Sequence, residues 1–253
     1  MVLNVLKKGF NFSQDGPGNR LVYHLQGCNM RCPWCANPES RKPEGTLLPS
    51  ENIGLHLSFT AEEVEDLLEE ATDSRPLFFE GGGVTLTGGE PTLQFDALKE
   101  FLTGLRANGI HTAIETNATH PRLRELFPLL DLLIMDCKHI DDRIHREATG
   151  ISNMTILGNI EKAMAEHGNV LIRTPLINGF NADIPTALHF LNFYRQFDTS
   201  RTRFELLKYH EYGREKWTAC GQPYEVKSGF ITDSIYTDIE NIYISGGLSV
   251  VRT

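Results

Sequence analysis

The sequence predicts an α/β fold, a partial (β/α)6 barrel with extensions at both ends. Short apolar runs alternate with longer segments of helical spacing, a pattern typical of βα units with a largely parallel sheet. The chain has 253 residues, of which 40% are hydrophobic, enough for one large core. Only six strand-like runs occur, fewer than the eight of a closed barrel.

Each predicted strand is a short apolar run that reads as buried or half-buried. The six runs are residues 21–26, 84–87, 111–116, 132–136, 170–175 and 204–209.

Helices are expected between these strands. Thr60 and Glu63 have the spacing of a capping box before Val64. Residues 95–108 carry apolar side chains near helical spacing before Gly109, which would end that helix.

Two later helices are predicted in the same way. One contains Ala163 and ends at Gly168, and in the other Asp183 is the cap and Pro185 falls in the first turn. The tail from Gly213 onward is the least readable part of the chain.

Composition limits the classes of partner. A net charge of −9 and a pI near 5.5 argue against nucleic acid as a partner. No apolar run approaches the roughly 18–20 residues that span a bilayer, and residues 1–10 are too short an apolar segment for a signal peptide. We therefore expect a soluble, cytoplasmic monomer with no membrane partner. We also expect a single domain over residues 1–253, with a core of about 15–217 and a C-terminal extension over 218–253.

Cys28, Cys32 and Cys35 form a Cys-x3-Cys-x2-Cys run with no adjacent fourth ligand. An iron–sulfur cube has four irons, so three thiolates leave one iron open to bind a reactant. Structural zinc usually takes four Cys or His ligands, and the other cysteines, Cys137 and Cys220, are isolated. An odd number of cysteines with no secretory leader also disfavours a disulfide framework. Cys137 reads as a small buried residue and Cys220 as a free thiol in the tail.

Polar residues follow the predicted strands, where a parallel sheet gathers its ligands. Gly88 and Gly89 would let the backbone approach a ligand and Glu90 offers a carboxylate, although a tight βα turn explains the same glycines. The next two strands end in Glu115-Thr116-Asn117 and Asp136-Cys137-Lys138. For Lys138 the simpler interpretation is an ion pair with its neighbour Asp136.

Three further side chains are candidates for this edge. Arg173 ends or nearly ends the fifth strand and could hold a carboxylate bidentately, or form a salt bridge to Asp136 or Glu115. His210 follows the sixth strand, where a lone histidine is more often structural than catalytic. Trp34 could cover the cluster and exclude water.

Together these segments resemble the radical SAM superfamily, and within it the glycyl radical enzyme activating enzymes of the pyruvate formate-lyase activase type. The resemblance runs from about Asp15 to Trp217. The cysteine run is the superfamily signature. Asp-Gly-Pro-Gly-Asn-Arg at 15–20 and Tyr-His-Glu-Tyr-Gly at 209–213, followed by Lys216-Trp217, narrow it to the activases.

The resemblance implies one [4Fe–4S] cluster on Cys28, Cys32 and Cys35, with S-adenosylmethionine (SAM) bound at the open iron. Gly88, Gly89 and Glu90 would meet the methionyl amino group of SAM. The full set implied to contact SAM is Trp34, Cys35, Ala36, Gly88, Gly89, Glu90, Thr116, Asn117, Asp136, Cys137, Lys138, Arg173 and His210. Of these, Lys138 is also implied in catalysis.

Relatives place a monovalent cation, Na⁺ or K⁺, beside the SAM carboxylate; the matching groups here are Glu115, Thr116, the Ile134 carbonyl and Asp136. Glu115 replaces the aspartate of the family, and Ala36 and Ala118 replace a histidine and a glycine of the pyruvate formate-lyase activase. Many activases carry a ferredoxin-like insert with eight further cysteines, but residues 36–59 contain none. The resemblance therefore implies a single cluster and leaves the target open.

The implied reaction begins when flavodoxin or ferredoxin delivers an electron. SAM is then cleaved to methionine and a 5′-deoxyadenosyl radical, which takes a hydrogen from a backbone glycine of a partner glycyl radical enzyme. Two alternatives stay open: a radical SAM enzyme that modifies a small metabolite or peptide, and a non-catalytic metal-binding or electron-transfer module.

Overall fold

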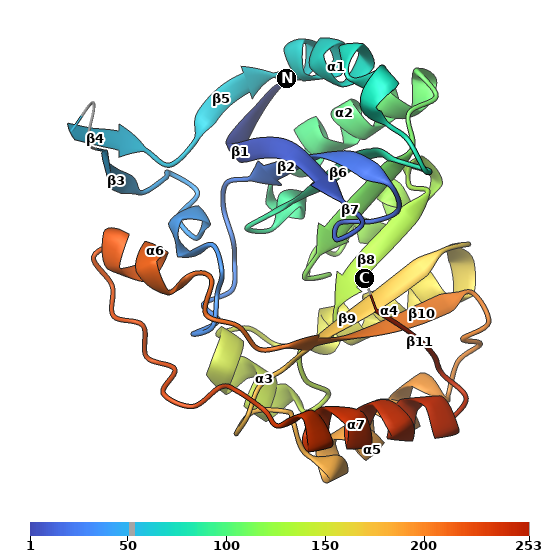
Figure 1. The fold of residues 1–253 in the computed structure, drawn as a ribbon. Helices are drawn as coiled ribbons and strands as arrows, with labels where there is room; N and C mark the ends of the chain where they lie inside the picture. The colour runs from blue at the N-terminus through green and yellow to red at the C-terminus, as the bar shows by residue number, and fades with distance from the viewer. Residues whose placement is uncertain (51–53, 253) are drawn as a thin grey trace.

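A nine-stranded sheet, in the order β11-β10-β9-β8-β7-β6-β2-β1-β5, forms the frame of the molecule (Figure 1). The computed structural model describes residues 1–50 and 54–252. The strands are β1 Val2–Phe12, β2 Asn19–Leu25, β5 Thr60–Glu63, β6 Gly83–Gly88, β7 Thr112–Thr116, β8 Leu132–Asp136, β9 Val170–Leu176, β10 Thr202–Lys208 and β11 Ser249–Val251. From β2 to β11 neighbouring strands are parallel, whereas β1 runs antiparallel to both β2 and β5.

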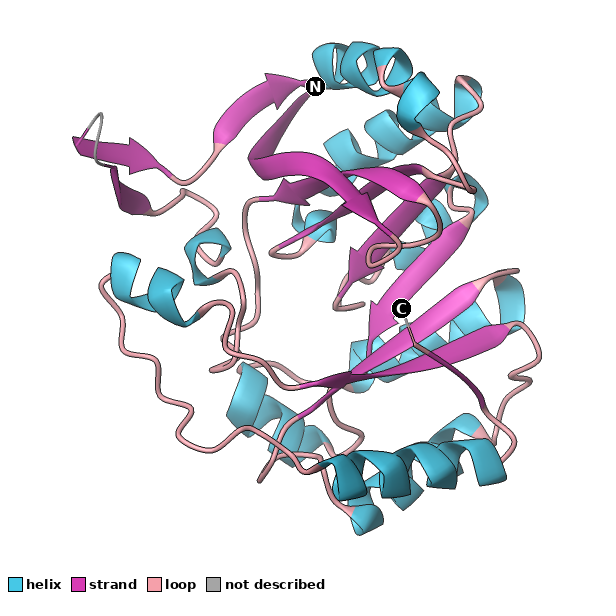
Figure 2. Cartoon of the chain, viewed as in Figure 1, coloured by secondary structure: helices cyan, strands magenta, loops and turns pink. Residues whose placement is uncertain are grey.

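Most of the helices cover the outer side of this sheet, whereas α6 Arg214–Ala219 lies apart from it (Figure 2). The other helices are α1 Val64–Asp73, α2 Phe95–Ala107, α3 Asp142–Thr149, α4 Met154–Glu166, α5 Ile184–Tyr194 and α7 Asp233–Ser245. Short 3-10 turns lie at η1 Pro38–Ser40, η2 Arg75–Leu77, η3 Pro91–Gln94 and η4 Leu123–Leu129. A separate two-stranded ribbon joins β3 Leu47–Ser50 to β4 Gly54–Leu57.

The predicted fold class is confirmed, and all six predicted strands are present as β2 and β6 to β10. The capping box predicted at Thr60 and Glu63, before helix α1, is not present. Thr60 begins β5, and Glu63 caps α1 in an extended conformation without a side-chain hydrogen bond. The reason is pairing with β1, where Val5 lies opposite Thr60 and Val2 opposite Glu63.

The cap predicted for α5 is confirmed. The Asp183 carboxylate accepts a 2.9 Å hydrogen bond from the Thr186 amide, and Pro185 lies in the first turn, where no amide donor is needed.

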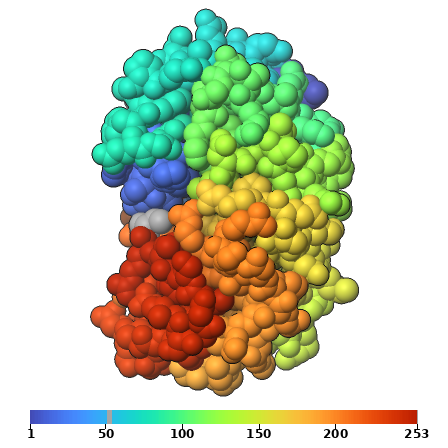
Figure 3. All heavy atoms as spheres, turned by 90° about the vertical axis from the view of Figure 1, so that its right-hand side faces the viewer, coloured from blue at the N-terminus to red at the C-terminus, as the bar shows by residue number. Residues whose placement is uncertain are grey.

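The C-terminal tail, the least readable part of the sequence, completes the fold. Helix α7 packs on α5, and the Tyr236 hydroxyl donates a 3.3 Å hydrogen bond to the Leu206 carbonyl of β10. Strand β11 then pairs with β10. In the space-filling view this C-terminal segment, in red, closes the lower part of one side of the molecule (Figure 3).

The two faces of the sheet differ in chemistry. The outer face packs a large apolar core against the helices, with Leu86, Phe101 and Tyr194 almost fully buried. A second, small apolar cluster consists of Ala113, Leu132, Ile134 and Leu171, which alternate with the first set and therefore face the inside of the curved sheet. No helix among the described residues is long and apolar enough to cross a membrane.

Candidate active site

The loop that carries the three cysteines, residues 27–37, leaves the end of β2 and is fixed at its base. The Gln26 side-chain amide donates hydrogen bonds of 3.0 and 2.7 Å to the carbonyls of Glu39 and Lys42. The Glu90 amide donates a 2.7 Å bond to the Gly27 carbonyl. The cysteine loop is thus held from both sides, by the segment after it and by the turn after β6.

All three thiols of the cysteine loop are free and shielded from water. Cys32 is buried, Cys28 and Cys35 are half-buried, and burial raises the pKa of Cys28 and of Cys32 to about 12. The Met30 amide lies 3.4 Å from the Cys28 sulfur, in position to donate a hydrogen bond.

Three thiols from one short loop, with an amide aimed at a sulfur, suit an iron–sulfur cluster, because N–H···S bonds stabilise the charge that cluster sulfurs carry. Among residues 1–50 and 54–252, no group of three or more His, Cys, Asp and Glu side chains forms a preassembled metal-ion site. The fit therefore depends on the chemistry of the cysteine loop.

Gly88 and Gly89 allow the end of β6 and the turn after it to lie against β2 and the cysteine loop. Gly88 has φ +126°, and a Cβ there would lie 2.2 Å from the Leu25 amide nitrogen. A Cβ on Gly89 would lie 2.1 Å from the Gly27 carbonyl oxygen. In the structure these glycines approach protein backbone, Gly88 that of β2 and Gly89 that of the cysteine loop.

Glu90 is fully buried, and four hydrogen bonds orient its carboxylate. It accepts from the Thr92 amide at 3.0 Å, the Thr92 hydroxyl at 2.5 Å, the Thr116 hydroxyl at 2.6 Å and the Asn117 amide at 2.6 Å. Burial raises the pKa of Glu90, while the hydrogen bonds favour the charged form. Asn117 continues this network to the cysteine loop through a 2.9 Å bond to the Asn29 side chain.

Lys138 and Asp136, at the end of β8, form an ion pair of 2.5 Å. The ion-pair interpretation of Lys138 is therefore confirmed. Burial disfavours the ammonium charge, but Asp136 and the nearby Cys32 thiol outweigh burial and raise the pKa of Lys138. The pair places a positive charge next to the cysteine loop. Cys137, between them, is buried as predicted.

Arg173 lies in the middle of β9, whereas the sequence predicted a position at or near the end of that strand. Its guanidinium forms ion pairs with Glu115 at 2.9 Å and Glu205 at 2.7 Å, and donates a 2.5 Å bond to the Gln14 carbonyl. The predicted salt bridge to Glu115 is present. Because Gln14 belongs to the loop between β1 and β2, these contacts hold that loop against the inner face of the sheet.

Three of the four predicted cation ligands, Glu115, Thr116 and Asp136, are engaged with protein groups. Burial would raise the pKa of Glu115, but Arg173 reverses that effect and lowers it. The Thr116 hydroxyl donates to Glu90 and Asp136 is paired with Lys138.

His210 and Trp34 lie at the margin of this group. His210 is exposed and stacks on the exposed ring of Tyr212, with ring centroids 4.2 Å apart. Trp34 is half-buried and packs against Phe180, with centroids 4.7 Å apart.

Helix α6 supports the back of the cysteine loop, a role that the sequence did not reveal. The Trp217 indole donates a 2.9 Å hydrogen bond to the Cys35 carbonyl. Lys216 pairs with Glu39 at 2.8 Å and donates a 2.7 Å bond to the Asn37 side chain. The Lys216-Trp217 pair was visible only as part of the family pattern.

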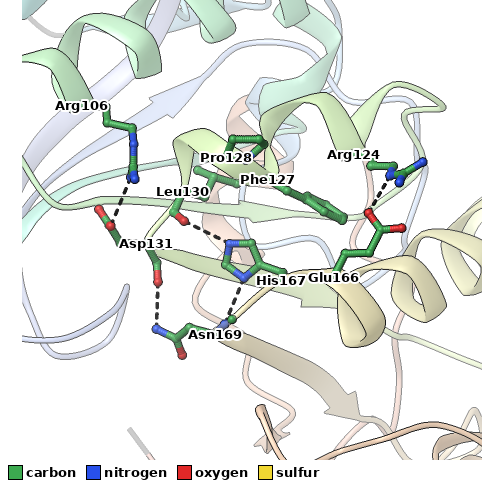
Figure 4. Close-up of a pocket in the computed structure, with 10 residues that line it drawn as sticks. Arg106, Arg124, Phe127, Pro128, Leu130, Asp131, Glu166, His167 and Asn169 are labelled. Atoms are coloured by element: carbon green, nitrogen blue, oxygen red, sulfur yellow. Dashed lines mark hydrogen bonds and ion pairs between the residues drawn. The ribbon is translucent and has the colours of Figure 1, made fainter.

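A cavity of about 600 Å³ lies at the opposite end of the strands, where β8 and β9 begin (Figure 4). Its polar groups bind one another: His167 bonds the Leu130 carbonyl, Asn169 bonds the Asp131 carbonyl and Arg124 pairs with Glu166. The cavity is far from the cysteine loop in the fold and shares none of the residues described above.

The comparisons with known proteins agree with this geometry. The family model described as the radical SAM superfamily matches residues 22–191. This chain belongs to the radical SAM superfamily. As a member it uses a [4Fe–4S] cluster and SAM.

The chain is also 34% identical to a pyruvate formate-lyase-activating enzyme of Staphylococcus epidermidis, over 85% of this chain and 84% of that protein. It is 31% identical to a (2S)-3-sulfopropanediol dehydratase activating enzyme of Klebsiella oxytoca, over 85% and 84% of the two chains. It therefore belongs to the same radical SAM family as these activating enzymes.

Solved structures support the same fold. A domain of a pyruvate formate-lyase-activating enzyme from Bacteroides vulgatus has a TM-score of 0.57 and 28% identity, covering 68% of this chain and 98% of that one. A radical SAM methyltransferase from Sphaerobacter thermophilus has a TM-score of 0.65 at 15% identity, covering 96% and 67% of the two chains, and indicates the fold alone.

Proposed function

We propose that this protein is an activating enzyme for a glycyl radical enzyme. The observation that carries the proposal is the kinship with two activating enzymes along most of the chain, combined with a cysteine loop whose thiols are free and shielded. The bound cluster and SAM supply the one-electron chemistry. One electron from an external donor would break the C5′–S bond of SAM and release methionine. The hydrogen of the glycine ends on 5′-deoxyadenosine, and the partner keeps an unpaired electron.

The chain's own residues position the cofactors. We propose that Cys28, Cys32 and Cys35 hold the cluster, and that the Asp136–Lys138 pair and the turn at Gly88, Gly89 and Glu90 line the SAM site. Because Glu90 and Lys138 are each held by contacts with the protein, the site is rigid before SAM arrives, which reduces the entropy lost on binding.

The rest of the proposed SAM contacts are Trp34, Ala36, Thr116, Asn117, Cys137, Arg173 and His210. Flavodoxin or ferredoxin is the proposed donor, and the protein is proposed to act as a single-domain monomer. We also propose Na⁺ or K⁺ at Glu115, Thr116, Ile134 and Asp136. The cation would then bind a carboxylate that also pairs with a basic side chain, Asp136 with Lys138 or Glu115 with Arg173.

The test uses protein reconstituted with iron and sulfide without oxygen and reduced with dithionite. We expect 5′-deoxyadenosine to form from SAM, and a doublet-type glycyl radical signal to appear when a glycyl radical enzyme is added. The partners to assay are pyruvate formate-lyase, (2S)-3-sulfopropanediol dehydratase and the glycyl radical enzymes of the source organism. SAM cleavage without a radical on any of these would refute the activating function and favour a small metabolite or peptide as substrate.

A further inference from the structure

The β3–β4 ribbon carries an exposed apolar face. In its antiparallel register Leu47 lies opposite Leu57, and Pro49 lies opposite Leu55. Opposed residues and residues two apart point to the same side of a ribbon, so these four side chains share one face. Leu47 is 62% exposed, Leu55 64% and Leu57 42%. We call these four residues the ribbon face.

The ribbon is firmly attached to the cysteine loop. Ser58, after β4, accepts a 3.0 Å bond from the Thr46 amide and donates a 3.2 Å bond to the Gln26 side chain. The Thr46 hydroxyl donates a 3.2 Å bond to the Glu39 carbonyl. Gln26 and Glu39 are also the groups that fix the base of the cysteine loop, so the ribbon and the cysteine loop have a common support.

In Figure 1 the ribbon projects away from the rest of the chain. An isolated two-stranded ribbon is only marginally stable in water. Exposing three leucines on one side of it is unfavourable, and this cost is removed when another apolar surface covers that side.

The chemistry of the ribbon face indicates what covers it. None of the described ribbon residues, 47–50 and 54–57, is charged. Docking of a small electron-transfer protein is typically steered by complementary charge over a small area. An uncharged apolar face suits a larger interface with a buried apolar centre, such as an enzyme forms with a protein substrate.

We propose that the ribbon face docks on an apolar surface patch of the glycyl radical enzyme that this protein activates. The inference rests on the proposed function, because it takes the partner to be the protein substrate. Through the common support at Gln26 and Glu39, docking of the ribbon face fixes the position of the partner relative to the cysteine loop.

The test compares Leu55→Asp and the double variant L47D/L55D with the wild type, using as partner whichever glycyl radical enzyme the wild type activates. Both positions are exposed, so the substitutions leave the core intact. Two carboxylates within a buried apolar contact are expected to raise the KM for the partner about tenfold or more. The kcat for radical formation and the rate of 5′-deoxyadenosine formation without partner should stay unchanged.

Two controls separate a specific effect from a general one. Leu55→Met keeps the apolar contact and should retain the wild-type KM. Met154→Asp places the same charge at a residue that is 74% exposed at the start of α4, and this variant should also retain the wild-type KM.

The outcomes are distinguishable. An unchanged KM in L47D/L55D overturns the docking inference but leaves the activating function intact. A wild type that activates none of the partners refutes both. If the variants fail to activate the partner only when flavodoxin replaces dithionite, the ribbon face binds the electron donor. If the wild type is a dimer and the variants are monomers, the ribbon face binds a second copy of this chain. Either result overturns the inference.

Discussion

The indole nitrogen of Trp217 donates a 2.9 Å hydrogen bond to the main-chain carbonyl of Cys35, across 182 residues of sequence. The Arg41 guanidinium lies 5.3 Å from the centre of the same indole ring. The buried ring of Trp217 therefore joins α6 to the last cysteine of the loop and to the segment that follows it.

Replacing Trp217 with phenylalanine should loosen the cysteine loop, because it removes the indole N–H and leaves a smaller ring in a buried position. We expect W217F to lose about 1 kcal/mol of unfolding free energy for the hydrogen bond, and more for the space that the smaller ring leaves. Its cluster absorbance should also decay faster in air than that of the wild type. Tyr212→Phe, at a ring that is 84% exposed, is the matched control and should decay at the wild-type rate. Equal decay of W217F and wild type would show that Trp217 does not retain the cluster.

Gly213 should tolerate no side chain. A Cβ there would lie 2.6 Å from the Cys35 carbonyl oxygen and 2.7 Å from the Ala36 Cα, so G213A must push the cysteine loop away from α6. We expect lower iron content after reconstitution and slower SAM cleavage. Gly158, inside α4, has open space around it, and G158A should keep full activity and gain up to about 1 kcal/mol from helix propensity. Normal iron content in G213A would contradict the tight contact.

Cys32→Ala should abolish the brown cluster colour and SAM cleavage together, because two thiolates cannot hold the cube in place. Cys220→Ala removes a thiol outside the cysteine loop and should leave both unchanged. Iron and acid-labile sulfide content, with 5′-deoxyadenosine yield, provide the measurement. SAM cleavage retained in C32A would remove Cys32 from the ligand set.

Arg173→Met should destabilise the fold more than the loss of a surface ion pair does. It removes the guanidinium that pairs with the buried carboxylate of Glu205 and with the partly exposed carboxylate of Glu115, and breaking a buried pair typically costs about 3 kcal/mol or more. Arg122→Met breaks exposed pairs with Glu125 and Asp96 and should cost less than about 1 kcal/mol. Urea unfolding at pH 7 gives both values, and similar losses in the two variants would contradict the buried network.

The protein should lose stability as the pH falls below about 6.5. Burial lowers the pKa of His24 to about 4, and lowers the pKa of His139, His145 and His167. Between pH 6.5 and 4 the unfolded chain binds protons that the folded chain refuses, so the stabilisation present above pH 6.5 is lost on acidification. His24 alone accounts for up to about 3 kcal/mol of that loss.

Urea unfolding at pH 7, 6 and 5 measures this loss, and His24→Asn should make it shallower. A variant whose unfolding free energy falls as steeply as that of the wild type would exclude His24 as a contributor.

Much of the fold could be predicted from the sequence because the parallel strands are short apolar runs bounded by turn residues. Strand β1 was not predicted, because its residues from Lys7 to Phe10 are exposed and its apolar pattern therefore stops halfway along the strand. The capping box at Thr60 failed because pairing with β1 outweighs a local helix signal. Helix α7 had a readable start, since the Thr232 hydroxyl caps the Ile235 amide at 3.3 Å.

In the candidate site, too, the parts that are local in sequence were predicted, whereas some long-range contacts were not. The cysteine loop, the Glu90 turn and the Asp136–Lys138 pair are local in sequence and were all predicted as site elements. The ion pair of Arg173 with Glu115 was also foreseen, but its contacts with Gln14 and Glu205 were not. These two residues lie 159 and 32 residues away in the chain, and only the closing of the sheet brings them to one side chain.

The large sheet ends in two very short strands, β5 with four residues at one edge and β11 with three at the other. Short edge strands offer few free backbone groups for another chain to pair with. A glycine-bearing segment of a partner would therefore find little backbone to pair with on β5 or β11 themselves. For the same reason the protein should resist edge-to-edge aggregation at the high concentrations that cluster reconstitution and spectroscopy require.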